Sequence, residues 1–351
     1  MKYIELFSGI GGFRNAADHL SADTKIKFKC VGFSEIDSHS LKTYFSNYKI
    51  NGEFKLNDIT KFAEDKKQIN LLPDFDLLLG GFPCQSFSIL GKKLGLEDER
   101  GKILFSINKI IKKKKPEFIV LENVRNIIQH NSGNTLNEIL NFFQDHKYRY
   151  TNYVILDTQN FGLPQRRSRI FFVCSKRPLE IDLTESAVIN NFHKIKRHSL
   201  QMYNNVLDIL RKDVDPKYYL SERIKCTILD GGTKNFWSNS QIDLDIARTL
   251  TATMVKWHRA CQDNYYSDDF ILNGESHKNT PKEKLFKIPI RRLTPTEALQ
   301  LQGFSKEFFE RATSAGVSEH QIYKQAGNAL SVNTGYALLH YLFVNQKIQN
   351  Y

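Results

Sequence analysis

The sequence has few cysteines, and their arrangement suggests neither a cross-link nor a metal site. Five cysteines occur in 351 residues, an odd and widely scattered set without a CxxC pair or a Cys/His pair at zinc spacing. We therefore expect a protein of a reducing compartment, with no disulfide framework, no structural metal and no metal cofactor.

Long apolar runs are also absent. No window approaches the ~20 uncharged apolar residues that a membrane-spanning helix needs. The first stretch, Met1–Gly9, contains Glu5 and lacks the small-residue cleavage site of a signal peptide. We expect a soluble, cytoplasmic protein that makes no contact with a membrane.

Acidic residues are in the minority. The chain holds 50 Lys and Arg against 38 Asp and Glu, a formal net charge of +12. This excess suits a polyanionic partner, although a chain that is merely rich in lysine explains the charge equally well. Hydrophobic residues make up 41% of the chain, enough to bury the core of one large domain or two ordinary ones.

Residues 1–178 alternate short apolar runs with amphipathic stretches, which predicts a doubly wound α/β sheet covered by helices. The predicted strands are 3–7, 28–33, 75–79, 118–121, 150–156 and 169–173. The predicted helices are 15–20, 38–47, 102–114 and 135–144. Ligands of such sheets bind beyond the carboxyl ends of the strands, so the residues there are the first candidates for a site.

A second, smaller domain is predicted at residues 179–290, where polar residues become frequent and the apolar runs shorten. A connecting segment, 291–322, follows it. The last segment, 323–351, contains an apolar helix over 331–344 whose natural docking site is the first domain. We therefore assign residues 1–178 and 323–351 to one domain.

The connecting segment opens with a helix start that can be read directly from the sequence. Thr294 can cap the helix, Pro295 fits its first position, and Glu297 completes a capping box.

A glycine-rich turn follows the first predicted strand in Phe7-Ser8-Gly9-Ile10-Gly11-Gly12-Phe13. Such a turn lets the backbone approach a ligand, but Arg14 stands where a dinucleotide-binding turn has its third glycine. Glu35 ends the second strand and Asp58 follows later. Each carboxylate taken singly is more typical of a helix cap; together at strand ends they favour a cofactor that contains adenosine.

Three further motifs could carry chemistry. Cys84 lies in the polar loop Gly-Gly-Phe-Pro-Cys-Gln-Ser-Phe-Ser, although a lone cysteine is usually structural. Glu122 ends a strand in Leu-Glu-Asn-Val, where it could merely cap a helix. Residues 165–169, Gln-Arg-Arg-Ser-Arg, could form a solvated turn or could bind phosphates and orient a base.

These motifs and two later segments, RRLTPTEALQLQGF and QAGNALSVNTG, occur in the order found in DNA (cytosine-5) methyltransferases. The chain resembles a bacterial restriction-modification member of that family. The resemblance implies a doubly wound mixed sheet, Rossmann-like and dependent on S-adenosylmethionine, with S-adenosylhomocysteine as product. It implies a cofactor site formed by Phe7, Gly9, Gly11, Glu35, Ile36, Asp58, Pro83 and Asn328.

The resemblance also implies a catalytic set. Cys84 would add to carbon 6 of cytosine, Glu122 would act at ring nitrogen 3, and Arg169 would hold the carbonyl oxygen of the base, with Arg167 close to the same site or to the phosphate. The base would have to be flipped out of duplex DNA. We expect a monomer whose pairing with a restriction endonuclease is functional and not physical.

Target recognition is assigned by the same resemblance to the second domain, residues 179–290. Its Arg-Thr-Leu-Thr-Ala segment matches a short motif of the family, and a basic and aromatic cluster that follows could reach the major groove or could be a hydrophobic anchor. Residues 86–101 could close over DNA or be an ordinary surface loop. The predicted DNA-contacting residues are Gln85, Ser88, Arg248, Thr249, Thr251, Lys256 and Arg259.

Several alternatives remain open on the sequence alone. A tRNA cytosine-5 methyltransferase would share the chemistry, and an inactive relative would bind DNA without it. Intact Cys84, Glu122 and Arg169 argue against the inactive relative. A cysteine hydrolase is disfavoured because no strand-end motif of this chain contains a histidine that could act as base. An adenine methyltransferase is disfavoured because the chain has no Asp/Asn-Pro-Pro-Tyr or Asp/Asn-Pro-Pro-Phe element.

Overall fold

The computed structural model describes residues 1–82, 99–233, 236–256 and 258–346, with the backbone alone at 99–102, 233 and 236. The chain divides into two compact units. Unit 1 comprises Met1–Asp157, Ser168–Leu200 and Thr334–Tyr351, and unit 2 comprises Thr158–Arg167 and Gln201–Asn333. The domain boundaries expected from the sequence stay a prediction.

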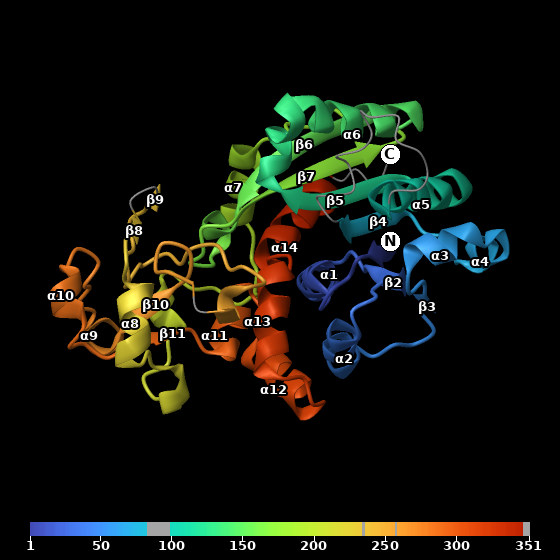
Figure 1. The fold of residues 1–351 in the computed structure, drawn as a ribbon. Coiled ribbons are helices and arrows are strands. Elements are labelled where there is room, and N and C mark those ends of the chain that lie inside the picture. The colour runs from blue at the N-terminus through green and yellow to red at the C-terminus, as the bar shows by residue number, and fades with distance from the viewer. Residues whose placement is uncertain (83–98, 234–235, 257, 347–351) are drawn as a thin grey trace. The chain divides into compact units, whose positions relative to one another are not determined.

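Unit 1 is built on a seven-stranded mixed sheet, which confirms the predicted fold class (Figure 1). Its strand order is β3(Phe54–Lys55), β2(Lys29–Phe33), β1(Lys2–Leu6), β4(Leu77–Gly81), β5(Phe118–Val124), β7(Ser168–Ser175) and β6(Tyr150–Asp157). The first five strands are parallel, and β7 is antiparallel to both of its neighbours. The order reverses between β1 and β4, the position at which ligands of doubly wound sheets bind.

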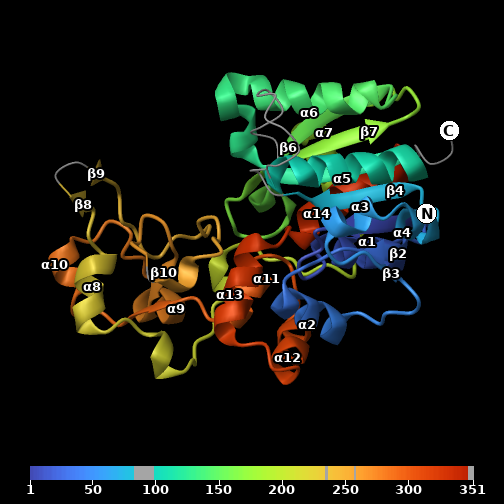
Figure 2. The ribbon, with the colours of Figure 1, turned by 45° about the vertical axis from the view of Figure 1, so that its right-hand side comes forward.

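Helices cover both faces of this sheet (Figures 1 and 2). One face packs on α3(Ile59–Glu64), α4(Lys66–Leu71), α5(Glu99–Lys114) and α6(Asn134–Asp145) through a continuous apolar core. The other face carries α1(Gly12–Asp23), α7(Glu185–Lys194) and α14(Val332–His340), which continues as a π-helical turn, Tyr341–Asn345. Helix α2(Ser38–Asn47) follows β2, and the short 3₁₀ turns Arg125–Ile128 and His130–Gly133 lie between β5 and α6.

The burial of β4 shows why the sheet needs both layers. Leu77, Leu78 and Leu79 are all fully buried although successive side chains point to opposite faces. A continuous apolar run of this kind is typical of a parallel strand covered on both sides.

Unit 2 contains short elements. Its strands form two antiparallel pairs, β8(Gly232–Thr233) with β9(Phe236–Trp237) and β10(Tyr265–Ser267) with β11(Ile290–Arg292). Its helices are α8(Glu222–Ile228), α9(Asp268–Asn273), α10(Lys282–Leu285), α11(Pro295–Gln300), α12(Lys306–Ser314) and α13(Glu319–Asn328). Its 3₁₀ turns are Thr158–Phe161, Val206–Asp208, Pro216–Tyr218 and Met254–Lys256. A small apolar cluster that includes Ile228, Tyr265 and Ile290 forms one core of this unit.

The capping box predicted for α11 is confirmed. The Thr294 hydroxyl accepts the amide of Glu297 at 3.3 Å, and the Glu297 carboxylate accepts the amide of Thr294 at 2.6 Å. The structure adds a fully buried ion pair between Arg291 and Glu297, at 2.9 Å, and a bond from the Arg211 amide to the same carboxylate. Glu297 therefore joins three segments of unit 2.

No helix in the described ranges is long and apolar enough to cross a membrane.

Candidate active site

The carboxyl ends of five parallel strands share one edge of the sheet, and β7 begins at that same edge because it runs the other way. The predicted residues of unit 1 follow these ends in turn. Phe7 follows β1, Glu35 follows β2, and Asp58 comes after β3. Glu122 lies near the end of β5. The topology therefore gathers carboxylates at one edge of the sheet.

The glycine-rich turn after β1 is held against the end of β2. Phe7 donates its amide to the Ser34 hydroxyl at 3.0 Å, and Ser8 donates its amide to the Ser34 carbonyl at 2.8 Å. Phe7, Gly9 and Gly11 all have positive φ angles. A Cβ on Gly11 would lie 2.6 Å from the Tyr48 ring, whereas one on Gly9 would meet no atom within 4 Å. Gly11 is needed for packing, and Gly9 leaves open space at the edge.

The Glu35 carboxylate is oriented by backbone amides. Its Oε2 accepts the Gly9 amide at 2.7 Å, and its Oε1 accepts the amides of Ile36 and Asp37 at 2.7 and 2.8 Å. The structure thus brings two predicted cofactor residues, Gly9 and Glu35, into direct contact. The adjacent Ile36 is 75% exposed, unusual for an apolar side chain beside an ordered carboxylate.

Asp58 caps α3. Its Oδ1 accepts the amide of Thr60 at 2.9 Å and the hydroxyl of Thr60 at 2.7 Å. Partial burial acts to raise the pKa of Asp58, but these hydrogen bonds outweigh it and hold the pKa below its usual value. Asp58 is therefore a carboxylate at neutral pH, and its predicted contact with the cofactor stays a prediction.

Glu122 and Arg169 form an ion pair at the same edge. Arg169 Nε lies 2.9 Å from Glu122 Oε1, and the two side chains are only 14% and 15% exposed. The antiparallel register of β5 and β7, which sets Glu122 opposite Phe171, brings them together. Gly81 lies opposite Glu122 on β4, where a Cβ would come within 3.2 Å of Glu122 Oε2. The acid and one arginine of the predicted catalytic set are therefore partners.

Pro83, Cys84, Gln85 and Ser88 lie outside the described residues. The strand that leads to them, β4, ends at Gly81 between β1 and β5.

Sequence reasoning missed Glu5. It lies in the middle of β1, is 2% exposed, and its Oε1 accepts the amide of Phe13 at the start of α1 at 3.2 Å. Burial raises the pKa of Glu5 to about 8, against the opposing charge of Arg14. The available signal was an acidic residue inside an apolar strand, a feature that by itself argues only against a signal peptide.

Arg167 belongs to unit 2, where its guanidinium group is buried. It donates to the carbonyls of Leu250 at 2.9 Å, Gly327 at 2.9 Å and Ala329 at 2.8 Å. These bonds tie the Gln-Arg-Arg segment to the predicted recognition motif and to the end of α13, where the predicted cofactor residue Asn328 lies. The role of Arg167 at the base or phosphate stays a prediction.

The recognition motif makes further hydrogen bonds to the Gln-Arg-Arg segment. We call this contact region, in which the Gln-Arg-Arg segment meets the recognition motif and the end of α13, the buried joint. Leu250 donates its amide to Gln165 Oε1 at 3.0 Å, and the Thr249 hydroxyl donates to the Arg166 carbonyl at 2.6 Å. A Cβ on Gly327 would lie 2.2 Å from the carbonyl carbon of Thr251, so only glycine fits there.

The other predicted DNA-contacting residues of unit 2 lie on either side of this joint. The Arg248 side chain donates to the Ala260 carbonyl at 3.1 Å. Lys256 is exposed and Arg259 is half-buried. Their contacts with DNA stay predictions.

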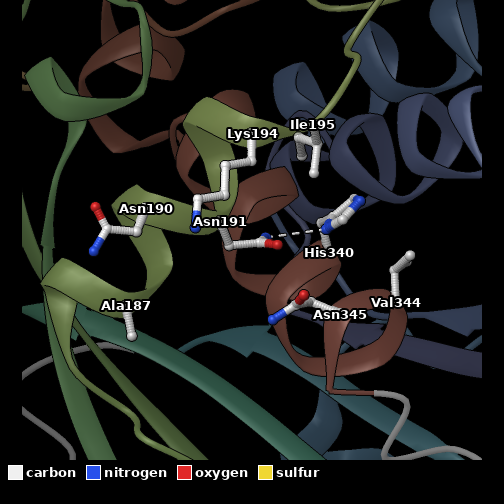
Figure 3. Close-up of a pocket in the computed structure, with 8 residues that line it drawn as sticks. All are labelled: Ala187, Asn190, Asn191, Lys194, Ile195, His340, Val344 and Asn345. Atoms are coloured by element: carbon white, nitrogen blue, oxygen red, sulfur yellow. Dashed lines mark hydrogen bonds between the residues drawn. The ribbon is translucent and has the colours of Figure 1, made fainter.

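A pocket of about 410 Å³ lies elsewhere in unit 1, between α7 and the C-terminal helix (Figure 3). Asn191 Nδ2 donates to His340 Nδ1 across it at 3.1 Å. The π-helical turn that closes it packs Phe343 on Phe28 and Phe118, at the amino ends of β2 and β5. The pocket is therefore on the side of the sheet away from the candidate active site.

No three His, Cys, Asp or Glu side chains gather as metal ligands in the part of the chain that the structure describes. The site in unit 1 instead offers backbone amides, carboxylates and one arginine.

Known proteins resemble this chain over almost its whole length. Type II methyltransferase M1.ScrFI of Lactococcus lactis subsp. cremoris is 36% identical over 338 residues, covering 96% of this chain and 76% of that protein. Type II methyltransferase M.DsaV of Dactylococcopsis salina is 34% identical over 334 residues, covering 95% of this chain and 83% of that protein.

Solved structures share the fold. The Entamoeba histolytica methyltransferase EhMeth matches with a TM-score of 0.74 at 23% identity, covering 98% of each chain. The Dnmt2 methyltransferase of S. pombe matches with a TM-score of 0.70 at 19% identity over the whole of both chains. A family model described as C-5 cytosine-specific DNA methylase matches residues 1–343. The chain therefore belongs to the C-5 cytosine-specific DNA methylase family.

Proposed function

We propose that this protein transfers a methyl group from S-adenosylmethionine to carbon 5 of a cytosine in a specific duplex DNA sequence. The observation that carries the proposal is the Glu122–Arg169 ion pair, at 2.9 Å, at the sheet edge where β4 ends, three residues before Cys84 in the sequence. An acid paired with a planar cation, together with a nucleophile supplied by Cys84, would meet the needs of covalent catalysis on a pyrimidine ring.

The strand-end residues of unit 1 fit the cofactor. Glu35 presents an oriented carboxylate suited to two ribose hydroxyls, Ile36 offers an uncovered apolar side chain for a purine face, and Asp58 can accept from an amino group. Gly9 leaves space for backbone contact. When bound, S-adenosylmethionine supplies an electrophilic methyl group. Phe7, Gly11, Pro83 and Asn328 complete the proposed cofactor site.

The chain's own residues make cytosine reactive enough to accept that group. The Cys84 thiolate adds to carbon 6, and the electrons of the 5,6 double bond move to carbon 5, which becomes enamine-like. The Glu122 carboxylate takes up a proton from water as the base binds and donates it to ring nitrogen 3, and Arg169 holds the carbonyl oxygen. After carbon 5 is methylated, its proton leaves to water, the double bond reforms, the Cys84 thiolate departs, and Glu122 recovers its proton.

The Glu122–Arg169 pair has a definite part in this sequence. Arg169 binds Glu122 through Nε and donates from Nη1 to the Ser168 carbonyl at 2.9 Å, which leaves Nη2 able to donate to a base. The two groups thus fix each other's orientation before the base arrives, which lowers the cost of ordering them at the moment of reaction.

Access to carbon 6 requires the cytosine to leave the duplex, at a cost of a few kcal/mol. We propose that Gln85 and Ser88 meet the flipped nucleotide or the gap it leaves. In unit 2, Arg248, Thr249, Thr251, Lys256 and Arg259 are the proposed DNA contacts, with Arg167 bracing the segment that carries the first three.

We further propose that the protein is the modification enzyme of a restriction-modification system in the bacterial cytoplasm. Two of its most similar relatives are named type II methyltransferases. The net charge of +12 supports a polyanionic substrate. The proposed endonuclease partner acts on the same DNA sequence and makes no complex with this chain, which we expect to be a monomer.

Bisulfite sequencing of plasmid DNA from cells that express the protein first identifies the target cytosine. The test is then whether the protein forms a covalent complex with duplex DNA that carries 5-fluorocytosine at that target. Fluorine at carbon 5 cannot leave as a proton, so the adduct with Cys84 should accumulate. Cys84→Ser should abolish the adduct, with the exposed Cys226→Ser variant as the control. Methyl transfer to duplex DNA by Cys84→Ala would refute the mechanism, and methylation of tRNA instead of DNA would refute the substrate.

A further inference from the structure

Trp237 is the most exposed of the large apolar side chains in the described residues, at 80%. It ends β9 and lies opposite Gly232 in the antiparallel β8–β9 pair. A Cβ on Gly231 would lie 3.4 Å from Trp237 Nε1, so one edge of the indole lies against the chain while most of the ring faces solvent. A large aromatic side chain left uncovered in this way is typical of a contact with a partner.

Both ends of the segment that carries Trp237 are held by one residue, Ala260. The Ala260 amide donates to the Ile228 carbonyl at 2.8 Å, and the Ala260 carbonyl accepts the amide of Gln241 at 3.3 Å. Ile228 precedes β8, Gln241 follows β9, and Ala260 between them is fully buried. From this base the β8–β9 pair extends away from α8 and from the β10–β11 pair (Figures 1 and 2). Trp237 is therefore exposed on an anchored element.

The same residue connects the β8–β9 pair to two of the proposed DNA contacts. The Ala260 carbonyl also accepts Arg248 Nε at 3.1 Å, and Arg259 directly precedes Ala260 in the chain. Sequence reasoning included both arginines in the DNA-contacting set but did not include Trp237. The structure thus places an uncovered aromatic ring on a segment whose base is bonded to the proposed contacts.

The charges around Trp237 suit a polyanion. Residues 231–242 contain one lysine and no Asp or Glu. The acid that precedes them, Asp230, has its carboxylate 3.8 Å from Lys282 Nζ, which offsets its charge. A phosphate backbone that approaches Trp237 therefore meets little repulsion from this segment.

We propose that Trp237 is a DNA-contacting residue. Its indole packs on the apolar parts of duplex DNA, the deoxyribose rings and the base edges with their thymine methyl groups, while Arg248 and Arg259 supply the charge. This inference rests on the proposed function, which supplies duplex DNA as the partner. It assigns Trp237 to binding and not to the chemical step.

The first experiment measures affinity for a fluorescently labelled duplex that contains the methylated cytosine found by bisulfite sequencing. We expect Trp237→Ala to weaken binding about 10- to 30-fold, because buried tryptophans dominate many interfaces. Trp237→Phe should restore most of the affinity, since it keeps an aromatic ring. Leu272→Ala is the matched control: Leu272, on α9 of the same unit, is also apolar and is 52% exposed. Its affinity should equal that of wild type.

The salt dependence of binding and the methylation kinetics separate an apolar contact from an ionic or catalytic one. The loss in Trp237→Ala should be the same factor at every salt concentration, because an apolar contact releases no counterions. Its KM for the duplex should rise while kcat stays at the wild-type value, as expected when uniform binding is lost.

Tryptophan fluorescence gives a readout that needs no known target sequence. The chain has two tryptophans, so Trp257→Phe leaves Trp237 as the sole emitter. We expect sonicated plasmid DNA to reduce quenching of this emission by acrylamide, because the covered ring is less accessible. If Trp257→Phe does not bind DNA as wild type does, the difference in emission between wild type and Trp237→Phe isolates the same signal.

The outcomes distinguish this inference from the proposed function. Unchanged acrylamide quenching on DNA binding, together with wild-type affinity in Trp237→Ala, would overturn the inference even if cytosine is methylated. A wild-type dimer that Trp237→Ala loses without loss of DNA affinity would also overturn it, in favour of a contact between two copies of the chain. If plasmid DNA protects Trp237 but no cytosine is methylated, the proposed function fails and the contact stands.

Discussion

At the scale of single residues, the carboxylates of unit 1 differ in what surrounds them, and their expected tasks differ accordingly. Within the described residues Glu35 accepts from backbone amides, so it is a preformed acceptor. Glu122 faces Arg169, whose guanidinium group helps to fix the orientation of its carboxylate. Glu5 is buried under α1 with one carboxylate oxygen unpaired in the described structure. Environment, more than residue type, separates a binding acid from a catalytic acid and a structural one.

Glu35 should determine cofactor affinity. We expect Glu35→Ala to weaken binding of S-adenosylmethionine by ~10- to 100-fold, because hydrogen bonds to a charged acceptor are worth about 1.5–3 kcal/mol. DNA binding should persist. Titration calorimetry checks the affinity, with Glu64→Gln, an exposed glutamate of α3, as the control. An affinity equal to that of wild type would show that Glu35 does not bind the cofactor.

Glu5 should make stability depend on pH. Its folded pKa of about 8 lies above the ordinary glutamate pKa of 4.5, so the folded state holds this proton across that range while the unfolded state releases it. Its contribution to stability is complete below the lower value and is lost as the pH rises toward 8, at up to about 1.4 kcal/mol per pH unit.

Urea denaturation of wild type and Glu5→Gln at pH 5, 6.5 and 8 tests this dependence. The amide does not titrate, so the free energy of unfolding of wild type should fall relative to that of the variant as the pH rises. A difference between the two proteins that is constant with pH would mean that Glu5 is ionised in the folded state.

At the scale of elements, the regular part of unit 1 could be predicted from sequence. All six predicted strands are present, and α2 occupies the predicted residues 38–47. The two-residue strand β3 was missed because Phe54 and Lys55 are too few to show an alternation of apolar and polar residues. The π-helical end of the C-terminal helix was missed because it shares the apolar pattern of an α-helix.

The contacts of the candidate site were less predictable. The sequence placed Glu122 and Arg169 at strand ends, but their ion pair depends on β7 running antiparallel to β5, and no local pattern encodes strand direction. The three carbonyls bound by Arg167 lie 83 to 162 residues away along the chain. Only tertiary structure shows that this arginine braces a joint.

The start of α11 offers a test at this scale. Glu297→Gln removes the charge that pairs with the fully buried Arg291 while preserving the shape of the side chain. We expect a loss of about 3 kcal/mol in the free energy of unfolding, because a buried charge is left without its partner. Urea denaturation measures it.

Glu310→Gln is the matched control. Glu310 pairs at 3.1 Å with Lys306, which lies one helical turn earlier in α12, and both side chains are about half exposed. Exposed pairs contribute roughly 0–1 kcal/mol, so this change should be nearly silent. Equal effects of the two substitutions would show that the buried pair adds no more than a surface one.

At the scale of the whole molecule, neither unit is a continuous stretch of chain. Unit 1 takes three segments and unit 2 takes two, with the boundary between Arg167 and Ser168 falling inside a single motif. One arginine of that motif braces unit 2, and another, two residues later, pairs with the acid of unit 1. The motif that resembles a catalytic signature is also a structural junction.

This interleaving has a consequence for how the protein is made. The residues that close unit 2 extend to Asn333, and those that complete unit 1 follow it. At about 5–20 residues per second, a ribosome needs ~10 to 40 s to pass from the end of β5, at Val124, to this last segment of unit 1, which begins at Thr334. For most of that time the nascent β4 and β5, apolar on both faces, await the C-terminal helix that packs behind them. The growing chain should therefore depend on chaperones until its last tenth has been synthesised.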